Sequence, residues 1–355
     1  MSDSEADVTQ PADDVKPLAE PAPKAFVRGQ QGGGSASPVS SGARPVVSDP
    51  VPVPTTGRKP EFGKYIVDKR VIGGKSECWE AHDLRTEGKC FLKIMPSPTF
   101  PSEEFRSVEP VAYATEVNSC NTWFGVQERI WERLKEVKPG SGSLVVPSDF
   151  FLHERRYVKV YPKVDSKGSL THEEATMWDQ VTRERFVRSL LFALHDLHSR
   201  GVVHADIKKE NILVVERPAG LIARLIDFDD AYESGSPPSI VRGTPELYSP
   251  EVLRNSYPED FAEFESHPLT CASDVFSLAL VLHEVFSARG QFPVWNGDGS
   301  NDPAHRAMLG QIPAYDSLGF GSEEFRARLQ QCLRPRPSER PSVEYLMTAL
   351  GLNYE

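Results

Sequence analysis

The sequence predicts an α+β fold with two lobes, because a strand-rich first third of the chain is followed by a mainly helical remainder. Residues 1–60 differ in composition and hold ten of the thirty prolines but a single aromatic side chain, Phe26. Such a segment cannot bury enough apolar surface to offset the entropy lost on ordering. We therefore expect a disordered Pro/Gly/Ser-rich tail over 1–60, serving as a spacer or as a docking or phosphorylation segment, ahead of one domain over 61–352.

The first lobe, about residues 61–163, is predicted from short runs of β-branched and aromatic residues separated by turn residues. Four prolines between residues 96 and 121 predict an irregular segment there, whose role the sequence does not explain. One main helix is expected over 123–137, where Ile130, Leu134 and Val137 recur at helical spacing. The predicted strands are 65–72, 78–82, 89–95, 150–153 and 157–161.

The second lobe, about residues 164–352, is predicted to be mostly helical. Phe186, Leu190, Leu191 and Leu194 recur with the period of a helix. Helices are expected over 178–199, 274–286 and 324–332, with strands at 212–214 and 221–226.

The bulk composition disfavours several classes of protein. The formal net charge of −11 does not suit nucleic-acid phosphate, which attracts basic surfaces. The five cysteines form no CxxC pair, which is typical of free thiols in a reducing compartment. No apolar run approaches the roughly 20 residues that span a bilayer, and the N-terminus has no apolar leader. We expect a cytoplasmic protein without a membrane span, and its oligomeric state is not readable.

The segment 202–214 carries the strongest chemical signal. Asp206 sits in a turn between apolar segments, and Lys208 and Asn211 follow two and five residues later. A loop anchored at both ends holds its polar groups in one geometry. Phosphoryl transfer requires such positioning together with charge neutralisation. An Asp can orient the attacking hydroxyl, a Lys can offset phosphoryl charge, and an Asn carbonyl can ligate Mg²⁺.

This segment resembles the catalytic loop of eukaryotic-type serine/threonine protein kinases, whose pattern is H-R-D-L-K-x-x-N. His204, Asp206, Lys208 and Asn211 match that pattern, and Ala205 replaces its Arg. The resemblance implies the bilobal protein-kinase fold, with His204 packing the loop. Kinases that have the Arg use it to receive an activation-loop phosphate, so Ala205 suggests that this chain does not depend on that switch.

Residues 225–230 resemble the metal-binding D-F-G motif and lie sixteen residues after Asn211. The resemblance implies that Asp227 chelates Mg²⁺ bridging the β- and γ-phosphates and that Phe228 packs beneath it. Asp229 stands where the family has Gly, which permits backbone flips that a side chain resists. The segment is therefore expected to swing less readily between active and inactive arrangements.

Residues 243–251 resemble the G-T-P-x-Y-x-A-P-E peptide-positioning loop. By this resemblance Thr244 would hydrogen-bond the catalytic loop, and a Thr here is typical of Ser/Thr kinases. Glu251 would pair with Arg340, and Asp274 would receive backbone N–H groups of the catalytic loop.

The first lobe matches less well. Lys93, in a stretch that resembles V-A-I-K, would bind the α- and β-phosphates of ATP. Where the family has its Gly-rich loop, only Gly73 keeps a glycine position, while Val71 and Ser76 replace the other two. Val71 and Gly73 are the expected nucleotide-covering positions.

The acidic partner of Lys93 stays open at this point. Helical periodicity places Gln127 at the position of the family's Glu, and Glu128 points about 100° away. Glu116 lies on the same face only if the helix begins much earlier. A neutral Gln would hold Lys93 less firmly than a carboxylate.

The sequence thus predicts a serine/threonine protein kinase that uses ATP and Mg²⁺ on a protein substrate bearing Ser or Thr. One alternative is a pseudokinase scaffold, favoured by Ala205, Asp229 and the poor Gly-rich loop. The other is a small-molecule kinase of the same fold, a class that lacks the 243–251 segment and the late Arg-Pro found here.

Overall fold

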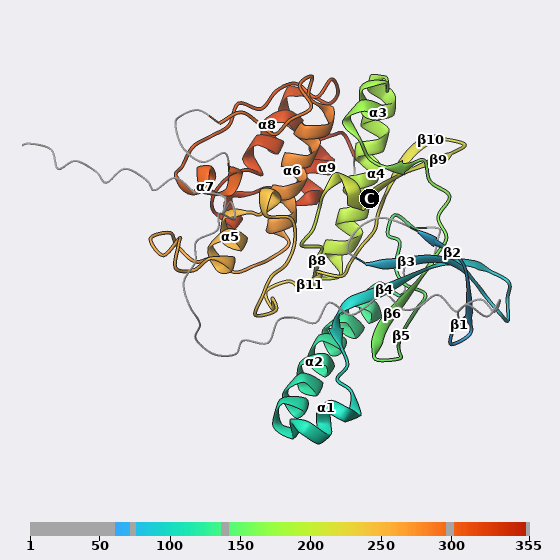
Figure 1. The fold of residues 1–355 in the computed structure, drawn as a ribbon. Helices are drawn as coiled ribbons and strands as arrows, with labels where there is room; N and C mark the ends of the chain where they lie inside the picture. The colour runs from blue at the N-terminus through green and yellow to red at the C-terminus, as the bar shows by residue number, and fades with distance from the viewer. Residues whose placement is uncertain (1–60, 72–75, 136–141, 296–301, 353–355) are drawn as a thin grey trace, which may run out of the picture.

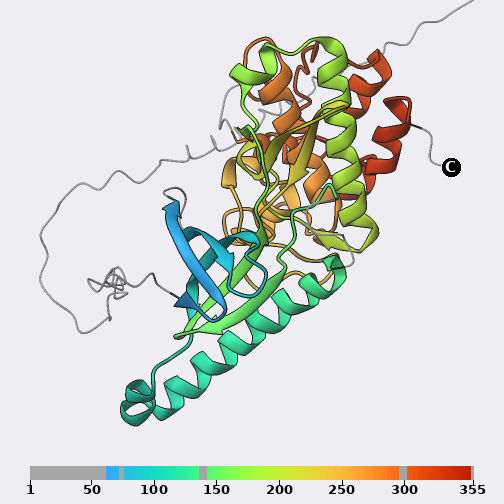
Figure 2. The same cartoon turned by 90° about the vertical axis from the view of Figure 1, so that its right-hand side faces the viewer.

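The computed structural model of this chain describes residues 61–71, 76–135, 142–295 and 302–352. A part rich in strands lies beside a larger, mostly helical part (Figures 1 and 2). This arrangement is α+β, as the sequence predicts. The expected tail over 1–60 and the expected nucleotide-covering Gly73 lie outside the described residues.

The strand-rich part is an antiparallel sheet in which the order of the strands is β1-β2-β3-β4-β6-β5. Its buried side chains, including Leu92, Ile94, Val158 and Val160, form a core on one face of the sheet. The strands are β1 (Glu61–Phe62), β2 (Tyr65–Val71), β3 (Glu77–Asp83), β4 (Lys89–Thr99), β5 (Asp149–His153) and β6 (Arg156–Pro162).

The prediction of an irregular segment over 96–121 is wrong. β4 continues to Thr99, and the helices α1 (Glu103–Val108) and α2 (Pro110–Leu134) follow. Pro110 does not break α2, because it occupies the first turn of the helix, where a missing N–H costs no hydrogen bond. The main helix therefore begins thirteen residues before the predicted start at Trp123.

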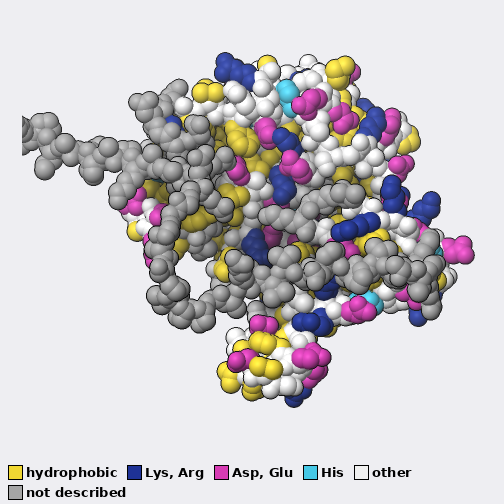
Figure 3. Space-filling view, viewed as in Figure 1, with side chains coloured by type: hydrophobic (Ala, Val, Ile, Leu, Met, Phe, Trp, Pro, Cys, Tyr) yellow, Lys and Arg dark blue, Asp and Glu magenta, His cyan; other side chains and the backbone are white. Residues whose placement is uncertain are grey.

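The N-terminal end of α2 and the whole of α1 project beyond the sheet (Figures 1 and 2). Val108 and Val111 are 75% and 80% exposed on this projection. Hydrophobic and acidic side chains mix at its tip (Figure 3). The other end of α2 is anchored, because Ile130 and Leu134 are buried in the core of the helical part.

The helical part is built around α6 (Ala272–Phe286), most of whose side chains are buried. Its other helices are α3 (His172–Thr176), α4 (Gln180–Ser199), α5 (Pro250–Ser256), α7 (Pro303–Met308), α8 (Glu323–Gln331) and α9 (Val343–Ala349). Asp179 caps α4 by accepting a hydrogen bond from the backbone N–H of Thr182, which fixes its start two residues after the predicted one. Within the described ranges, every helix is too short or too polar to span a bilayer.

The strands of two small sheets flank the two loops that hold the predicted site residues, 204–211 and 226–231. One has the order β10-β9-β7, and the other pairs β11 with β8. Their strands are β7 (Gly168–Ser169), β8 (Val202–Val203), β9 (Ile212–Arg217), β10 (Gly220–Leu225) and β11 (Tyr232–Glu233). The segment between β8 and β9 is the predicted catalytic loop, and the segment after β10 holds Asp227.

Candidate active site

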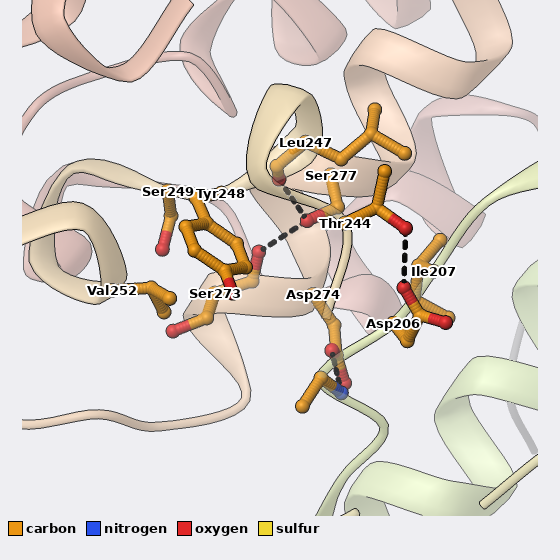
Figure 4. Close-up of a pocket in the computed structure, with 11 residues that line it drawn as sticks. Asp206, Ile207, Thr244, Leu247, Tyr248, Ser249, Val252, Ser273, Asp274 and Ser277 are labelled. Atoms are coloured by element: carbon orange, nitrogen blue, oxygen red, sulfur yellow. Dashed lines mark hydrogen bonds between the residues drawn. The ribbon is translucent and has the colours of Figure 1, made fainter. Parts of the chain in front are cut away.

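The loop between β8 and β9 gathers polar side chains around the carboxylate of Asp206. Thr244 Oγ1 donates a hydrogen bond to Asp206 Oδ1 at 2.7 Å, and the two side chains point toward each other in Figure 4. On the other carboxylate oxygen, Lys208 Nζ lies 2.5 Å away and Asn211 Nδ2 3.0 Å away. Lys208 Nζ is also 3.3 Å from Thr244 Oγ1. Residues separated by up to 38 positions in sequence thus share one hydrogen-bonded group.

These bonds set the charge state of Asp206. Its side chain is buried, and burial alone would raise the pKa of the carboxyl. Hydrogen bonds from Lys208 and Thr244 outweigh that effect and leave the pKa of Asp206 below its ordinary value. The group is therefore a carboxylate at neutral pH, able to accept a hydrogen bond from an alcohol. The small pocket beside it is lined by Ala205, Ile207 and Thr244, among others (Figure 4).

Asp274, at the start of α6, holds the backbone of the predicted catalytic loop. Its buried carboxylate accepts hydrogen bonds from the backbone N–H groups of His204, at 2.8 Å, and Ala205, at 2.9 Å. His198 Nε2 lies 2.9 Å from the same carboxylate. The ring of His204 is buried, and its Nε2 lies 3.0 Å from the carbonyl oxygen of Ile226. His204 therefore joins the catalytic loop to the strand that leads to Asp227.

Asp227 lies beside the catalytic loop, because the N–H of Ile226 donates to the carbonyl oxygen of Asn211 at 3.0 Å. Its backbone is left-handed, with φ of 68°, a conformation that costs free energy for residues other than glycine. Phe228 is buried and packs at 5.1 Å, ring centre to ring centre, from His204. The carboxylate of Asp227 stays partly exposed and lies 2.7 Å from Lys93 Nζ.

Asp227 and Asn211 fit a magnesium ion that is shared with a phosphate. Mg²⁺ prefers oxygen ligands and usually takes one or two from protein, with the rest from water and substrate phosphates. Asp227 offers a carboxylate, and Asn211 keeps its side-chain carbonyl oxygen while its amide nitrogen bonds Asp206. Among the described residues no group of three or more His, Cys, Asp or Glu side chains is arranged to hold a metal by itself. Water and phosphate oxygens would complete the coordination.

Lys93, on β4, binds two carboxylates of the segment after β10. Its Nζ lies 2.7 Å from Asp227 Oδ1 and 2.6 Å from Asp229 Oδ2. Burial lowers the pKa of Lys93, but the charges of Asp229 and Asp227 reverse that effect and raise it above its ordinary value. Val71 lies two strands away, paired with Cys78, which is paired in turn with Lys93.

None of the three candidates on the main helix is a partner of Lys93 among the described contacts. Glu116 and Glu128 are exposed. Gln127 is buried but bonds elsewhere: its Oε1 accepts from Lys159 Nζ at 2.7 Å, and its Nε2 donates to the carbonyl oxygen of Asp229 at 3.0 Å. The acidic partners of Lys93 lie not on the helix but in the segment after β10.

Lys159 is a charged residue of this site that sequence reasoning missed. It is only 3% exposed, and its Nζ lies 2.6 Å from Asp229 Oδ1. The signal in the sequence is a single Lys in the middle of the apolar run of β6. A charge in such a position requires a buried counter-charge.

Glu251 and Arg340 form a buried ion pair. Arg340 Nη1 and Nη2 each lie 2.7 Å from one carboxylate oxygen of Glu251, and both side chains are fully buried. Arg340 also donates to the carbonyl oxygens of Ala272 and Pro335. Ser273, in the first turn of α6, donates to Glu251, so the pair ties the 243–251 segment to the helix that carries Asp274.

A second ion pair links helix α2 to the segment after Asp227. Glu233, on β11, accepts from Arg133 Nε at 3.0 Å and from Arg129 Nε at 3.2 Å. The carboxylate of Glu233 thus pairs with both arginines of α2. Ala205, in the loop between β8 and β9, has a left-handed backbone with φ of 67°.

Comparison with known proteins matches this site to one family. The protein kinase domain family matches residues 143–350, which is more than half of the 355-residue chain. The serine/threonine-protein kinase nekl-2 of Caenorhabditis elegans is 31% identical over 199 residues, which cover 56% of this chain and 48% of that protein. Mitogen-activated protein kinase kinase kinase 5 of Arabidopsis thaliana is 29% identical over 209 residues, 58% of this chain and 26% of that protein.

A third relative carries a different specificity in its name. The membrane-associated tyrosine- and threonine-specific cdc2-inhibitory kinase wee-1.3 of Caenorhabditis briggsae is 32% identical over 166 residues, 46% of this chain and 22% of that protein. The matched part covers less than half the length of each of these relatives. The family match spans the catalytic loop, Asp227, the 243–251 segment and Arg340. This chain therefore belongs to the protein kinase family.

Proposed function

We propose that this chain transfers the γ-phosphate of ATP to Ser or Thr hydroxyls of a protein substrate. The observation that carries the proposal is the shared hydrogen-bonded group of Asp206, Lys208, Asn211 and Thr244, together with the backbone hydrogen bond that joins Asn211 to the residue before Asp227. The two parts of the described chain are the two lobes of a kinase, about 61–163 and 164–352, with residues 1–60 as a tail.

Each residue of the group has one role in this reaction. Asp206 orients the acceptor hydroxyl and accepts its proton, since its lowered pKa keeps it a carboxylate. Lys208 lies between Asp206 and Thr244 and offsets charge on the phosphoryl group in transfer. Asn211 and Asp227 would hold Mg²⁺, which neutralises phosphate charge when bound. Lys93 binds the α- and β-phosphates, with Val71 and Gly73 covering the nucleotide.

Thr244 supports Ser and Thr as acceptors. A Thr at this position of the 243–251 segment is typical of Ser/Thr kinases, and its hydroxyl donates to Asp206 at 2.7 Å. Tyrosine is the second candidate acceptor, because one relative is named for tyrosine and threonine specificity. Matched peptides that carry Ser, Thr or Tyr at one position distinguish the two.

Transfer of label from [γ-³²P]ATP to a generic protein substrate tests the proposal. We expect Mg²⁺-dependent incorporation into Ser and Thr that falls to background in Asp227→Ala, because that variant removes a metal-binding carboxylate. ATP binding without transfer to protein would favour a small-molecule kinase. A wild-type protein that binds no nucleotide would favour a pseudokinase scaffold.

We also predict that activity does not depend on phosphorylation between Asp227 and Glu251. Ala205 supplies no Arg for a phosphate, and Glu233 already provides a fixed negative charge to Arg129 and Arg133. The triple variant Ser234→Ala, Ser236→Ala and Ser239→Ala should keep its rate of transfer within several-fold of wild type in the same assay. A hundredfold loss would contradict this prediction.

A further inference from the structure

Lys93 and Lys159 face each other across neighbouring strands, and this creates an electrostatic problem. They are direct partners in the register of β4 and β6, and both side chains are largely buried. Two ammonium groups in one low-dielectric space repel each other unless carboxylates lie between them. In the described part of the chain, Asp227 and Asp229 supply two negative charges against these two positive ones.

Asp229 is the residue that separates the two lysines. Its Oδ2 lies 2.6 Å from Lys93 Nζ, and its Oδ1 lies 2.6 Å from Lys159 Nζ. The two oxygens of one carboxylate thus hold one lysine each. Its backbone is held as well, because Gln127 donates to its carbonyl oxygen at 3.0 Å.

The helix contributes to this cluster without a charge of its own. Gln127 touches both Lys159 and the backbone of Asp229, while its neighbour Glu128 is exposed. A carboxylate at the position of Gln127 would place a third negative charge beside Lys159. The neutral amide instead accepts one hydrogen bond and donates another, and so links the helix to the segment after β10.

We propose that Asp229 is the positioning residue for Lys93, in the role that a carboxylate on the main helix would otherwise fill. This inference rests on the proposed function, in which Lys93 binds ATP phosphates and Asp227 binds the metal. When the carboxylate of Asp227 is engaged by metal, Lys93 still has Asp229 to hold its ammonium group in place. Lys159 fixes Asp229 in turn, and Gln127 fixes Lys159.

Steady-state kinetics of Asp229→Asn test the proposal. The amide keeps the size of the side chain but removes the charge that holds Lys93. We expect the KM for ATP to rise about tenfold or more, which corresponds to ~1.4 kcal/mol. The KM for the peptide should stay within about twofold, because the peptide does not contact Lys93. A protein that is merely less well folded would lower kcat through a smaller active fraction and leave both KM values unchanged.

A charge-balanced double variant controls for stability. Asp229→Asn alone leaves Lys159 buried without its carboxylate, so this variant should be less stable than wild type. Asp229→Asn combined with Lys159→Met removes both charges. We expect the double variant to regain thermal stability but to keep the raised KM for ATP. The matched control Glu128→Gln, which neutralises an exposed carboxylate one position from Gln127, should behave as wild type.

Each other outcome overturns a specific statement. Unchanged KM for ATP in Asp229→Asn, with the wild type active, overturns the positioning role and leaves the proposed function standing. A normal KM for ATP in the double variant would show that Lys159, not Lys93, caused the defect, and also overturns the role. If the wild type transfers no phosphate, the proposed function fails. In that case calorimetric titration with ATP decides the role of Asp229. The role is overturned if wild type and Asp229→Asn bind ATP with equal affinity, or if neither protein binds ATP.

Discussion

Asp206→Asn is expected to reduce the rate of phosphoryl transfer by about 10²–10⁴-fold, the usual contribution of a positioned general base. The amide keeps the size of the side chain and can still accept from Thr244 Oγ1, which lies 2.7 Å from Asp206 Oδ1. It cannot accept a proton from the substrate hydroxyl, and it no longer neutralises Lys208 at 2.5 Å. The loss should appear in kcat, measured with saturating ATP and peptide.

ATP affinity should change little in Asp206→Asn, because the contacts proposed for the nucleotide come from Lys93, Asn211 and Asp227. The matched control is Asp196→Asn on α4, whose carboxylate pairs with Arg200 on the surface at 3.2 Å. Its kcat should equal that of wild type. An Asp206→Asn protein that retained a tenth or more of wild-type kcat would remove Asp206 from the reaction.

Glu251→Gln is expected to lower the free energy of unfolding by about 3–5 kcal/mol, because it leaves the guanidinium of Arg340 buried without a counter-charge. Both side chains are fully buried, and the two hydrogen bonds between them are 2.7 Å long. Arg340 cannot turn toward water, since carbonyl oxygens of Ala272 and Pro335 also hold it. Urea denaturation monitored by circular dichroism measures the change.

Two comparisons make the Glu251→Gln result specific. Glu184→Gln removes the carboxylate of a partly exposed pair with Arg188 and should cost about 0.5 kcal/mol or less. Adding Arg340→Met to Glu251→Gln should restore part of the lost stability, because no charge then stays buried. Equal losses in Glu251→Gln and Glu184→Gln would contradict the importance of burial.

The same ion pair has a defined dependence on pH. Burial would raise the pKa of Glu251, but the charge and hydrogen bonds of Arg340 outweigh it and lower the pKa below the ordinary Glu value. A lowered folded-state pKa contributes stability that is fully present above the unfolded-state pKa. That contribution is lost as the pH falls through the folded-state pKa. Acid should therefore lower the free energy of unfolding of wild type more than that of the double variant Glu251→Gln, Arg340→Met.

The polar group around Asp206 was readable from the sequence because most of it lies within one short segment. Asp206, Lys208 and Asn211 span six positions between two strands, so their spacing alone restricts their geometry. The sequence also placed β9, β10 and α6 within a few residues, whereas β8, which precedes the loop, was not predicted. Local patterns of this kind do not depend on how distant parts of the chain pair.

The partner of Lys93 was not readable, because it depends on tertiary register. Lys93, Lys159 and Asp229 meet only when β6 pairs with β4 and the segment after β10 brings Asp229 to both lysines. The early start of α2 was missed for a different reason. A proline breaks a helix when it lies in the interior but is favoured in the first turn. The sequence pattern around Pro110 does not distinguish these two positions.

The attachment of the catalytic loop to Asp274 has a consequence for how this protein is inactivated by heat. The carboxylate that holds the backbone of His204 and Ala205 belongs to α6, a helix most of whose side chains are buried. The loop is flanked by β8 and β9, but the backbone of His204 and Ala205 is also held by this helix, so packing of the helix contributes to the order of the loop. Loss of turnover and melting of the interior should therefore be one cooperative event, and substitutions far from Asp206 that loosen α6 would reduce catalysis without touching any reacting atom.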